Sequence, residues 1–206
     1  SAFDGCTSLQ TVNFAVGSML SSIEGYAFRG CSSLLKLELP DSLATVAQYA
    51  FEGCISIEEL SVPKWDIIAY NLPSLKKLAI RFAPIEQSNF MFPKHLTHIN
   101  LPEGLEEIGM FAFEGCKELA SIIIPSTVKV IGSYSFSGCE SLTSIIIPDN
   151  VTLIGESAFA DCILLEDITF GIGLKSIGIE AFIGCVSLKE IVIPDTVEEM
   201  GNKAFY

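Results

Sequence analysis

Residues 112–134 read AFEGCKELASIIIPSTVKVIGSY, and the same pattern returns in the three stretches that follow, 135–157, 158–180 and 181–203. Each of the four copies is 23 residues long, and residues 204–206, AFY, begin a fifth. A sequence that resembles itself at a fixed period of this length is typical of repeat proteins, in which each repeat is one structural unit stacked on the next. The period therefore decides the fold class before any single residue is considered.

The first half of the unit predicts a β-strand that ends at a proline. Inward-facing positions alternate around Ile122 and Ile124, and β-branched residues dominate there, as they do in strands. Pro125 follows at once and ends the hydrogen-bonded ladder, because it has no backbone N–H to donate. We expect Val128 and Ile131 to point into the core beyond this turn.

The second half of the unit predicts a return path built on glycine and phenylalanine. Gly132 is expected to turn the chain by taking a positive φ. Phe113 and Phe136 are expected to fill the far side of the core, and Gly115 and Gly138 to turn the chain back toward the next cysteine. One such coil cannot bury its own apolar face, so neighbouring coils must share a continuous core.

The pattern C-x-x-L-x-x-I-x-I-P, followed by I-G-x-x-A-F-x-x-C, resembles the BspA-like (Treponema-type) leucine-rich repeat. The resemblance covers nearly the whole chain and holds in register in several copies. It implies a leucine-rich-repeat solenoid with a parallel β-sheet on one face and irregular or short helical turns on the other. It also implies proteins that bind other macromolecules, often as adhesins on the surface of anaerobic bacteria and protozoan parasites.

The expected strands can be placed along the whole chain by the inward-facing residue of each. These residues are Val12, Leu37, Leu60, Leu78, Ile99, Ile122, Ile145, Ile168 and Ile191. We expect about nine coils of about 23 residues that form a single solenoid over residues 1–206, with irregular repeats at 64–102. Neither end of the sequence is a polar capping unit. We therefore expect a segment of a longer protein, or end-to-end self-association through uncapped repeats.

Seven cysteines occupy the same place in seven of the repeats: Cys6, Cys31, Cys54, Cys116, Cys139, Cys162 and Cys185. Side chains in register point the same way, so their Cβ atoms are expected to stay ~5 Å apart, too far for the ~3.8 Å of a disulfide. The odd count is a second objection to a disulfide framework. We expect buried free thiols that act as small apolar fillers. A zinc site is disfavoured, because one ligand per coil cannot surround a tetrahedral ion.

The net charge of −13 argues against a nucleic-acid partner, whose phosphates it would repel. No uninterrupted apolar run approaches the ~18 residues that a membrane span needs, so we expect no direct insertion into a membrane.

One candidate contact surface lies on the outer face of the expected sheet. Because residues alternate inward and outward along a strand, Ile123, Ile146, Thr169 and Val192 should follow one another in line. An exposed row of β-branched residues between polar ones is a plausible partner-binding surface. The alternative is that these residues merely favour strands.

A second candidate is the basic stretch 64–98, which carries five basic residues against two acidic ones in an otherwise acidic chain. Trp65, Lys77, Arg81 and His98 are its candidate partner-binding residues, because solenoids often place binding sites in irregular repeats. The alternative is that degenerate repeats have drifted in composition. His95 and His98 have no third ligand spaced with them, so they do not predict a metal site.

No arrangement of serine, cysteine, histidine or carboxylate residues argues for catalysis, and an open solenoid offers no deep pocket. We expect a protein that is not an enzyme, has no cofactor and binds no metal. Its expected function is that of a protein-binding module, a cell-surface or secreted adhesin that docks a protein or glycoprotein on its sheet face. The alternative is a cytoplasmic structural scaffold, or a subunit of a larger assembly such as a cytoskeletal one.

Overall fold

The computed structural model describes residues 1–64, 72–82 and 91–206. The chain forms two compact units, Ser1–Phe82 and Ala83–Tyr206, and each is described by itself. The boundary falls inside the irregular stretch 64–102. The assignment of residues 1–206 to a single domain stays a prediction.

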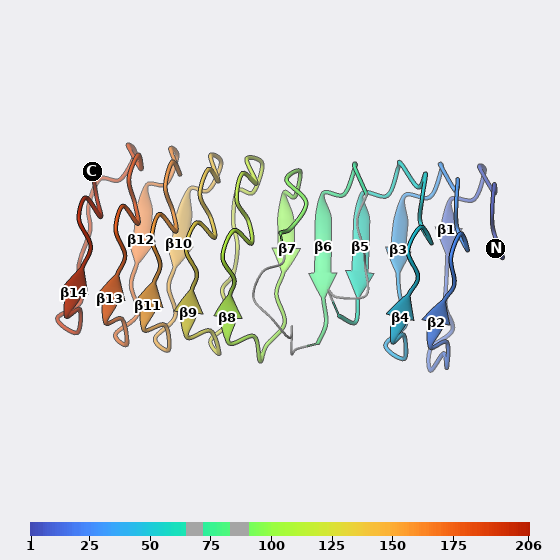
Figure 1. Ribbon diagram of the computed structural model, residues 1–206, viewed down its shortest axis with the longest axis horizontal. Helices are drawn as coiled ribbons and strands as arrows, with labels where there is room; N and C mark the ends of the chain where they lie inside the picture. Colours follow the sequence, from blue (N-terminus) through green and yellow to red (C-terminus); the bar gives the residue numbers. More distant parts are fainter. Residues whose placement is uncertain (65–71, 83–90) are drawn as a thin grey trace. The chain divides into compact units, whose positions relative to one another are not determined.

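The first unit is built from two parallel ladders of short strands (Figure 1). One ladder joins β1 (Thr11–Val12), β3 (Lys36–Glu38), β5 (Glu59–Val62) and β6 (Lys77–Ile80). The other pairs β2 (Ser22–Ile23) with β4 (Thr45–Val46). Leu60 pairs with Leu37 on one side and with Leu78 on the other. The predicted register is therefore confirmed even across the shorter repeat that ends at β6.

The second unit repeats this arrangement at a constant offset (Figure 1). The first side of its coils carries β7 (His98–Asn100), β10 (Ser144–Ile146) and β12 (Asp167–Thr169), and β10 pairs with β12 in parallel. The second side carries one continuous parallel ladder of β8 (Glu107–Ile108), β9 (Val130–Ile131), β11 (Leu153–Ile154), β13 (Ser176–Ile177) and β14 (Glu199–Met200). Ile108, Ile131, Ile154, Ile177 and Met200 are in register. Paired residues of neighbouring coils, such as Ile145 and Ile168, are therefore separated by one sequence period.

The expected strand positions all lie in the described residues, and seven of the nine are strands. The exceptions are the coils of Ile122 and Ile191, where the structure forms no strand. The alternation of burial persists there: Ile122 and Ile124 are buried, whereas Ile123 between them is exposed. The inward and outward assignment is therefore confirmed where the strand itself is not.

The second ladder corrects the expectation for the back of the coil. The resemblance implied irregular or short helical turns on this side, yet Val130–Ile131 forms a two-residue strand, as do the equivalent residues of the other coils in the second unit. The rest of the back consists of consecutive turns, and no helix occurs in the described part of the chain. The short-helical alternative was wrong, and a physical reason is visible. One residue in each of these turns has a positive φ, which interrupts a right-handed helix.

Those positive φ angles recur two residues after the glycine of each Ile-Gly pair and of the equivalent pair Met200-Gly201. In the second unit they belong to Phe111, Tyr134, Ser157, Glu180 and Lys203, with φ between 49° and 61°. The amide of the same residue donates to a carbonyl of the following coil, as Tyr134 N–H does to Glu156 O at 2.8 Å. This third line of backbone hydrogen bonds satisfies turn amides that would otherwise be unpaired.

The role expected for Gly132 was wrong, because its φ does not lie in the positive range. Gly132 instead lets two coils approach closely: a Cβ on it would lie 2.8 Å from the backbone of Ile108 and Gly109 in the preceding coil. Gly155 is tighter still, at 2.5 Å from Ser133 N. The turn glycines Gly115 and Gly138 do have positive φ, as expected.

Stacked side chains fill the core of each coil. Phenylalanine rings lie parallel in two columns, with centroids 4.5–5.3 Å apart and planes within 13°. The columns are Phe3, Phe28 and Phe51 in the first unit, and Phe92, Phe113, Phe136, Phe159, Phe182 and Phe205 in the second. The spacing matches the ~4.8 Å between neighbouring strands, so the ladder itself sets the contact distance of the rings.

The cysteines form a further column, and all seven are free. Six are buried, and the Sγ of each donates to a backbone carbonyl of the preceding coil at 3.1–3.6 Å. The expectation of free thiols is confirmed. Cys6 is the exception to their burial, since it is exposed.

Candidate protein-binding face

The outer face of the second unit presents an exposed row of aliphatic side chains, which we call the sheet-face row: Ile123, Ile146, Thr169 and Val192. Ile146 and Thr169 are direct partners in the β10–β12 pair. Ile123 is 85% exposed, Ile146 69% and Val192 73%. The neighbours Ile145 and Ile147, in contrast, are buried. At β10 the backbone therefore holds Ile146 in solvent while Ile145 and Ile147 belong to the core.

The sheet-face row has polar residues on its flank. The preceding outward position of each strand is Ser121, Ser144, Asp167 and Glu190, all exposed. Lys189 directly precedes Glu190, and its Nζ lies 2.7 Å from a Glu166 carboxylate oxygen in the neighbouring coil. An apolar strip between polar borders is the composition expected of a protein contact surface.

The candidates Lys77 and Arg81 belong to the first unit and are engaged within it. Lys77 Nζ lies 2.7 Å from Glu59 Oε1, and Lys36 Nζ lies 3.4 Å from the other oxygen of Glu59. These two cations lower the pKa of Glu59, and Glu59 in turn raises the pKa of Lys77. The lysine charge is thus largely compensated on the sheet.

Arg81 crosses three successive coils of the first unit. Its Nε donates to Asp41 Oδ1 at 2.7 Å, and its two terminal nitrogens donate to Ser61 Oγ and to the carbonyl of Leu39. Its side chain is 24% exposed. A guanidinium that satisfies so many of its donors internally serves first to hold the coils in register.

His98 lies at the start of β7 in the second unit and is exposed. Its Nδ1 is 2.8 Å from the hydroxyl of Thr97. His95 Nδ1 lies 3.8 Å from Glu118 Oε1. Trp65 lies outside the described residues. Within the described ranges, no group of three or more histidine, cysteine or acidic side chains could hold a metal ion.

Two surface features escaped the sequence reasoning. Ile163, Leu164 and Val186 are exposed in the turns that follow the cysteines, at 40%, 49% and 81%. The sequence does indicate that these positions are exposed, because other coils carry lysine, glutamate or serine there. Tyr26 and Tyr49 stack at 5.8 Å in the first unit and are 40% and 50% exposed.

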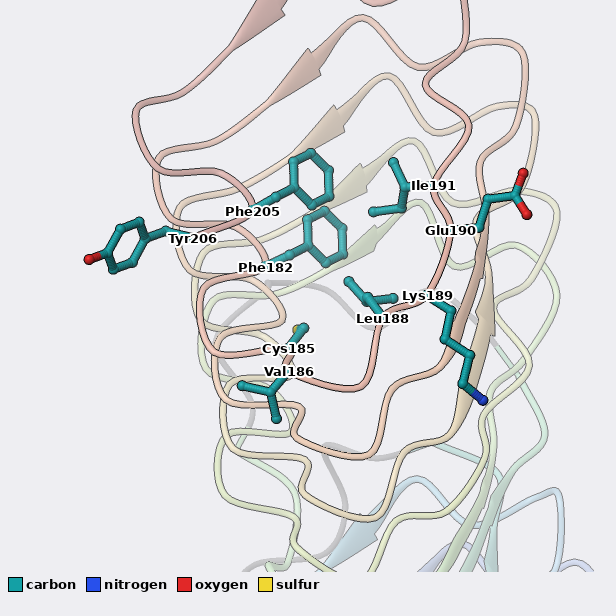
Figure 2. A pocket seen from close by; sticks show the side chains of 9 residues that line it. All are labelled: Phe182, Cys185, Val186, Leu188, Lys189, Glu190, Ile191, Phe205 and Tyr206. Atoms are coloured by element: carbon teal, nitrogen blue, oxygen red, sulfur yellow. The ribbon is translucent and has the colours of Figure 1, made fainter.

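A hollow of about 460 Å³ lies against the last coil (Figure 2). It is lined by Phe182, Cys185, Val186, Leu188, Lys189, Glu190, Ile191, Phe205 and Tyr206. Phe182 and Phe205 stack at 5.0 Å, so part of the wall is the core column itself. In the coils of residues 112–180, the positions equivalent to Phe182, Cys185 and Leu188 are buried under the next coil. The expected end-to-end association would use this hollow and stays a prediction.

Repeated parallel coils with two ladders, stacked phenylalanines and a register of 23 residues define a leucine-rich-repeat solenoid architecture. The family model for the BspA type leucine rich repeat region matches residues 1–76 and 83–206 in six copies. This chain belongs to that family. Within the described residues, no helix has the length and apolar character that a membrane crossing needs.

Solved structures of bacterial repeat proteins are similar to this chain. A leucine-rich repeat protein from Bacteroides ovatus is 29% identical, with a TM-score of 0.59, over 91% of this chain and 50% of that one. The T. pallidum leucine-rich repeat protein is 28% identical, with a TM-score of 0.50, over 83% of this chain and 72% of that one. The chain thus spans half the length of the Bacteroides ovatus protein. No curated protein matches it.

Proposed function

We propose that this chain is a non-enzymatic protein-binding module whose sheet-face row docks a macromolecular ligand. The observation that carries the proposal is the exposure of Ile123, Ile146 and Val192 at equivalent positions of successive coils, where the neighbours of Ile123 and Ile146 are buried. When a partner covers such side chains, the removal of apolar area from water contributes roughly 25 cal/mol per Å² to the free energy of binding. The surface is held by ladders and core stacking, so it needs little ordering when it binds.

The ligand class that suits this surface is a protein or glycoprotein, presented at the cell surface in keeping with what the repeat family implies. Membership of a repeat family of binding proteins supports a contact function and gives no support to catalysis.

A capture experiment tests the proposal with a charge-neutral double variant, Ile123→Ser/Ile146→Ser. The wild-type chain is immobilised and incubated with host-surface glycoproteins, matrix proteins and a lysate of the source cell. We expect a partner retained by the wild type and lost by the variant. The matched control is Leu153→Ser/Ile179→Ser, which removes exposed aliphatic side chains from the second-ladder side, at 38% and 50% exposure. Equal capture by both variants and the wild type would overturn the proposal.

A structural scaffold inside the cell is the second candidate. It is favoured by one observation, the seven free cysteines, because a reducing compartment keeps thiols in this state. The same capture separates the two, since a partner found only in the cell's own lysate supports the scaffold.

A further inference from the structure

The charges around the sheet-face row indicate what kind of partner it accepts. Asp167 and Glu190 occupy the same outward position in consecutive coils, on the flank of Thr169 and Val192. Within the described residues, neither carboxylate forms an ion pair. Lys189 is a cation that interacts with Asp167. The pKa of Lys189 is raised mainly by Glu166, to which it is hydrogen-bonded, and to a smaller degree by Asp167. One lysine thus faces two carboxylates here, Glu166 and Asp167.

The opposite flank of the row is acidic as well. Asp149 and Asp195 lie in the turns that follow the strands, and both are exposed. Asp149 accepts a hydrogen bond from the amide of Ile172 at 3.1 Å, which keeps its carboxylate at the surface of the turn. Carboxylates thus lie on the strand flank at Asp167 and Glu190 and in the turns after the strands at Asp149 and Asp195.

At the equivalent outward position of the first unit, residues of both charges follow one another and form ion pairs. There Lys36, Glu59 and Lys77 follow one another, and the central carboxylate binds both lysines, at 3.4 and 2.7 Å. In the second unit the corresponding residues are Ser144, Asp167 and Glu190, with no cation among them. Like charges at neighbouring positions of a sheet destabilise it, and a cation placed between them relieves the repulsion.

The whole described part of the second unit shares this imbalance. Residues 91–206 contain six lysines, no arginine and sixteen acidic residues, a net charge of −10. Four of the six lysines are bonded to glutamates of a neighbouring coil: Lys117, Lys129, Lys175 and Lys189. Few cations remain to neutralise the carboxylates that border the row.

We infer that the sheet-face row binds a protein segment that carries lysine or arginine beside aliphatic side chains. The inference rests on the proposed function and adds the chemistry of the partner. The partner's aliphatic groups cover Ile123, Ile146 and Val192, and its cations lie between Asp167 and Glu190 on one flank and near Asp149 and Asp195 on the other. An anionic partner would meet a net repulsion on both flanks.

Three synthetic peptides test the inference on the complete 206-residue chain. All three have the same valine and isoleucine positions, and the residues between them are lysine, glutamine or glutamate. Binding is followed through the NMR signals of Ile123, Ile146 and Val192 at low ionic strength and at about 1 M salt, where the Debye length is about 3 Å. We expect the lysine peptide to bind tightest, and its advantage to disappear in high salt.

The matched variants are Asp167→Asn/Glu190→Gln on the sheet face and Glu107→Gln/Glu199→Gln on the second ladder. Both pairs change the net charge equally. We expect the first to weaken binding of the lysine peptide about 3- to 10-fold at low salt, and the second to leave it unchanged.

Two results overturn the inference and leave the docking face standing: the glutamine peptide shifts the same signals as strongly as the lysine peptide, or the Asp167→Asn/Glu190→Gln variant binds like the wild type. If none of the peptides perturbs the row and Ile123→Ser/Ile146→Ser also captures every partner, both the inference and the proposed function fail.

Discussion

The Sγ of Cys139 donates a hydrogen bond to the backbone carbonyl of Phe113, one coil earlier, at 3.3 Å. Each buried cysteine makes the equivalent bond to the coil before it. The thiol therefore both fills the core and adds a link between coils, because it donates to a carbonyl that already accepts from the Cys116 amide in its own coil. This double role explains why cysteine, and not alanine or valine, suits the position.

Burial of these thiols predicts a decline of stability at alkaline pH. It raises the pKa of Cys54 to about 11 and that of Cys116 to about 12, whereas an unfolded thiol titrates near ~8.5. Above that lower value the unfolded chain loses protons that the folded chain keeps, so the free energy of unfolding falls as pH rises. Urea denaturation at a series of pH values should show little change below pH ~8 and a steady loss above it.

A Cys54→Ala/Cys116→Ala variant serves as the control for that experiment. It should be less stable at neutral pH but should decline less steeply above pH ~8.5, because two of the linked groups are gone. An identical slope in both proteins would assign the decline to lysine and tyrosine instead.

Thiol reactivity should distinguish one cysteine from the other six. Cys6 is exposed, and the remaining thiols are buried. A thiol-specific reagent applied to the native protein should modify Cys6 alone, and it should reach the others only in denaturant, because the reacting species is an accessible thiolate. Mass spectrometry of the labelled peptides gives the count. Rapid native labelling at Cys139 or Cys162 would contradict the packing described above.

The glycine of the Ile-Gly pair should be irreplaceable even by alanine. In Gly155→Ala the new methyl group would lie 2.5 Å from Ser133 N, so the two coils must separate. We expect a loss of ~1–3 kcal/mol or more in the free energy of unfolding, as for other overpacked sites. The control is Gly25→Ala, whose methyl group would meet its nearest atom, Gln48 O, at 3.5 Å. That variant should stay within ~0.5 kcal/mol of the wild type.

Adjacent isoleucines on β10 should respond in opposite ways to truncation. Ile145 is 2% exposed, so Ile145→Ala should cost ~2–5 kcal/mol by leaving a cavity. Ile146 is 69% exposed, and Ile146→Ala should change stability by less than ~0.5 kcal/mol. Hydrogen exchange of Ile145→Ala should show lost protection centred on the coils next to 135–157, because each repeat contacts only its neighbours. Uniform loss over the described chain would be inconsistent with that picture.

Arg81 provides a test of whether a candidate binding residue is structural. Its hydrogen bonds to Asp41, Ser61 and Leu39 join three coils, so Arg81→Met should destabilise the protein by ~1.5–3 kcal/mol. Lys77→Met removes an exposed ion pair and should destabilise the protein much less, because solvent screens the interaction. Thermal denaturation of the two variants gives the comparison. Equal effects would leave Arg81 available for a partner.

The sequence predicted the stacking well because its period sets the register. A single offset places Ile145 on Ile168, and the alternation around Ile123 identifies which side chains face outward. The second ladder could not be predicted in this way, because a two-residue strand such as Val130–Ile131 has no alternation to detect. The function of Gly132 was missed because close approach depends on the backbone of another coil. Contacts such as Lys117 with Glu140 likewise exist only once two coils are stacked.

The left-handed corner after each Ile-Gly or Met-Gly pair of the second unit allows the sequence of such a chain to diversify. The same backbone angle carries phenylalanine at 111, tyrosine at 134, serine at 157, glutamate at 180 and lysine at 203. The shape of the corner is therefore imposed by its neighbours and tolerates aromatic, hydroxyl, acidic and basic groups in turn. Evolution can rewrite the chemistry of this edge one coil at a time while the scaffold beneath it stays the same.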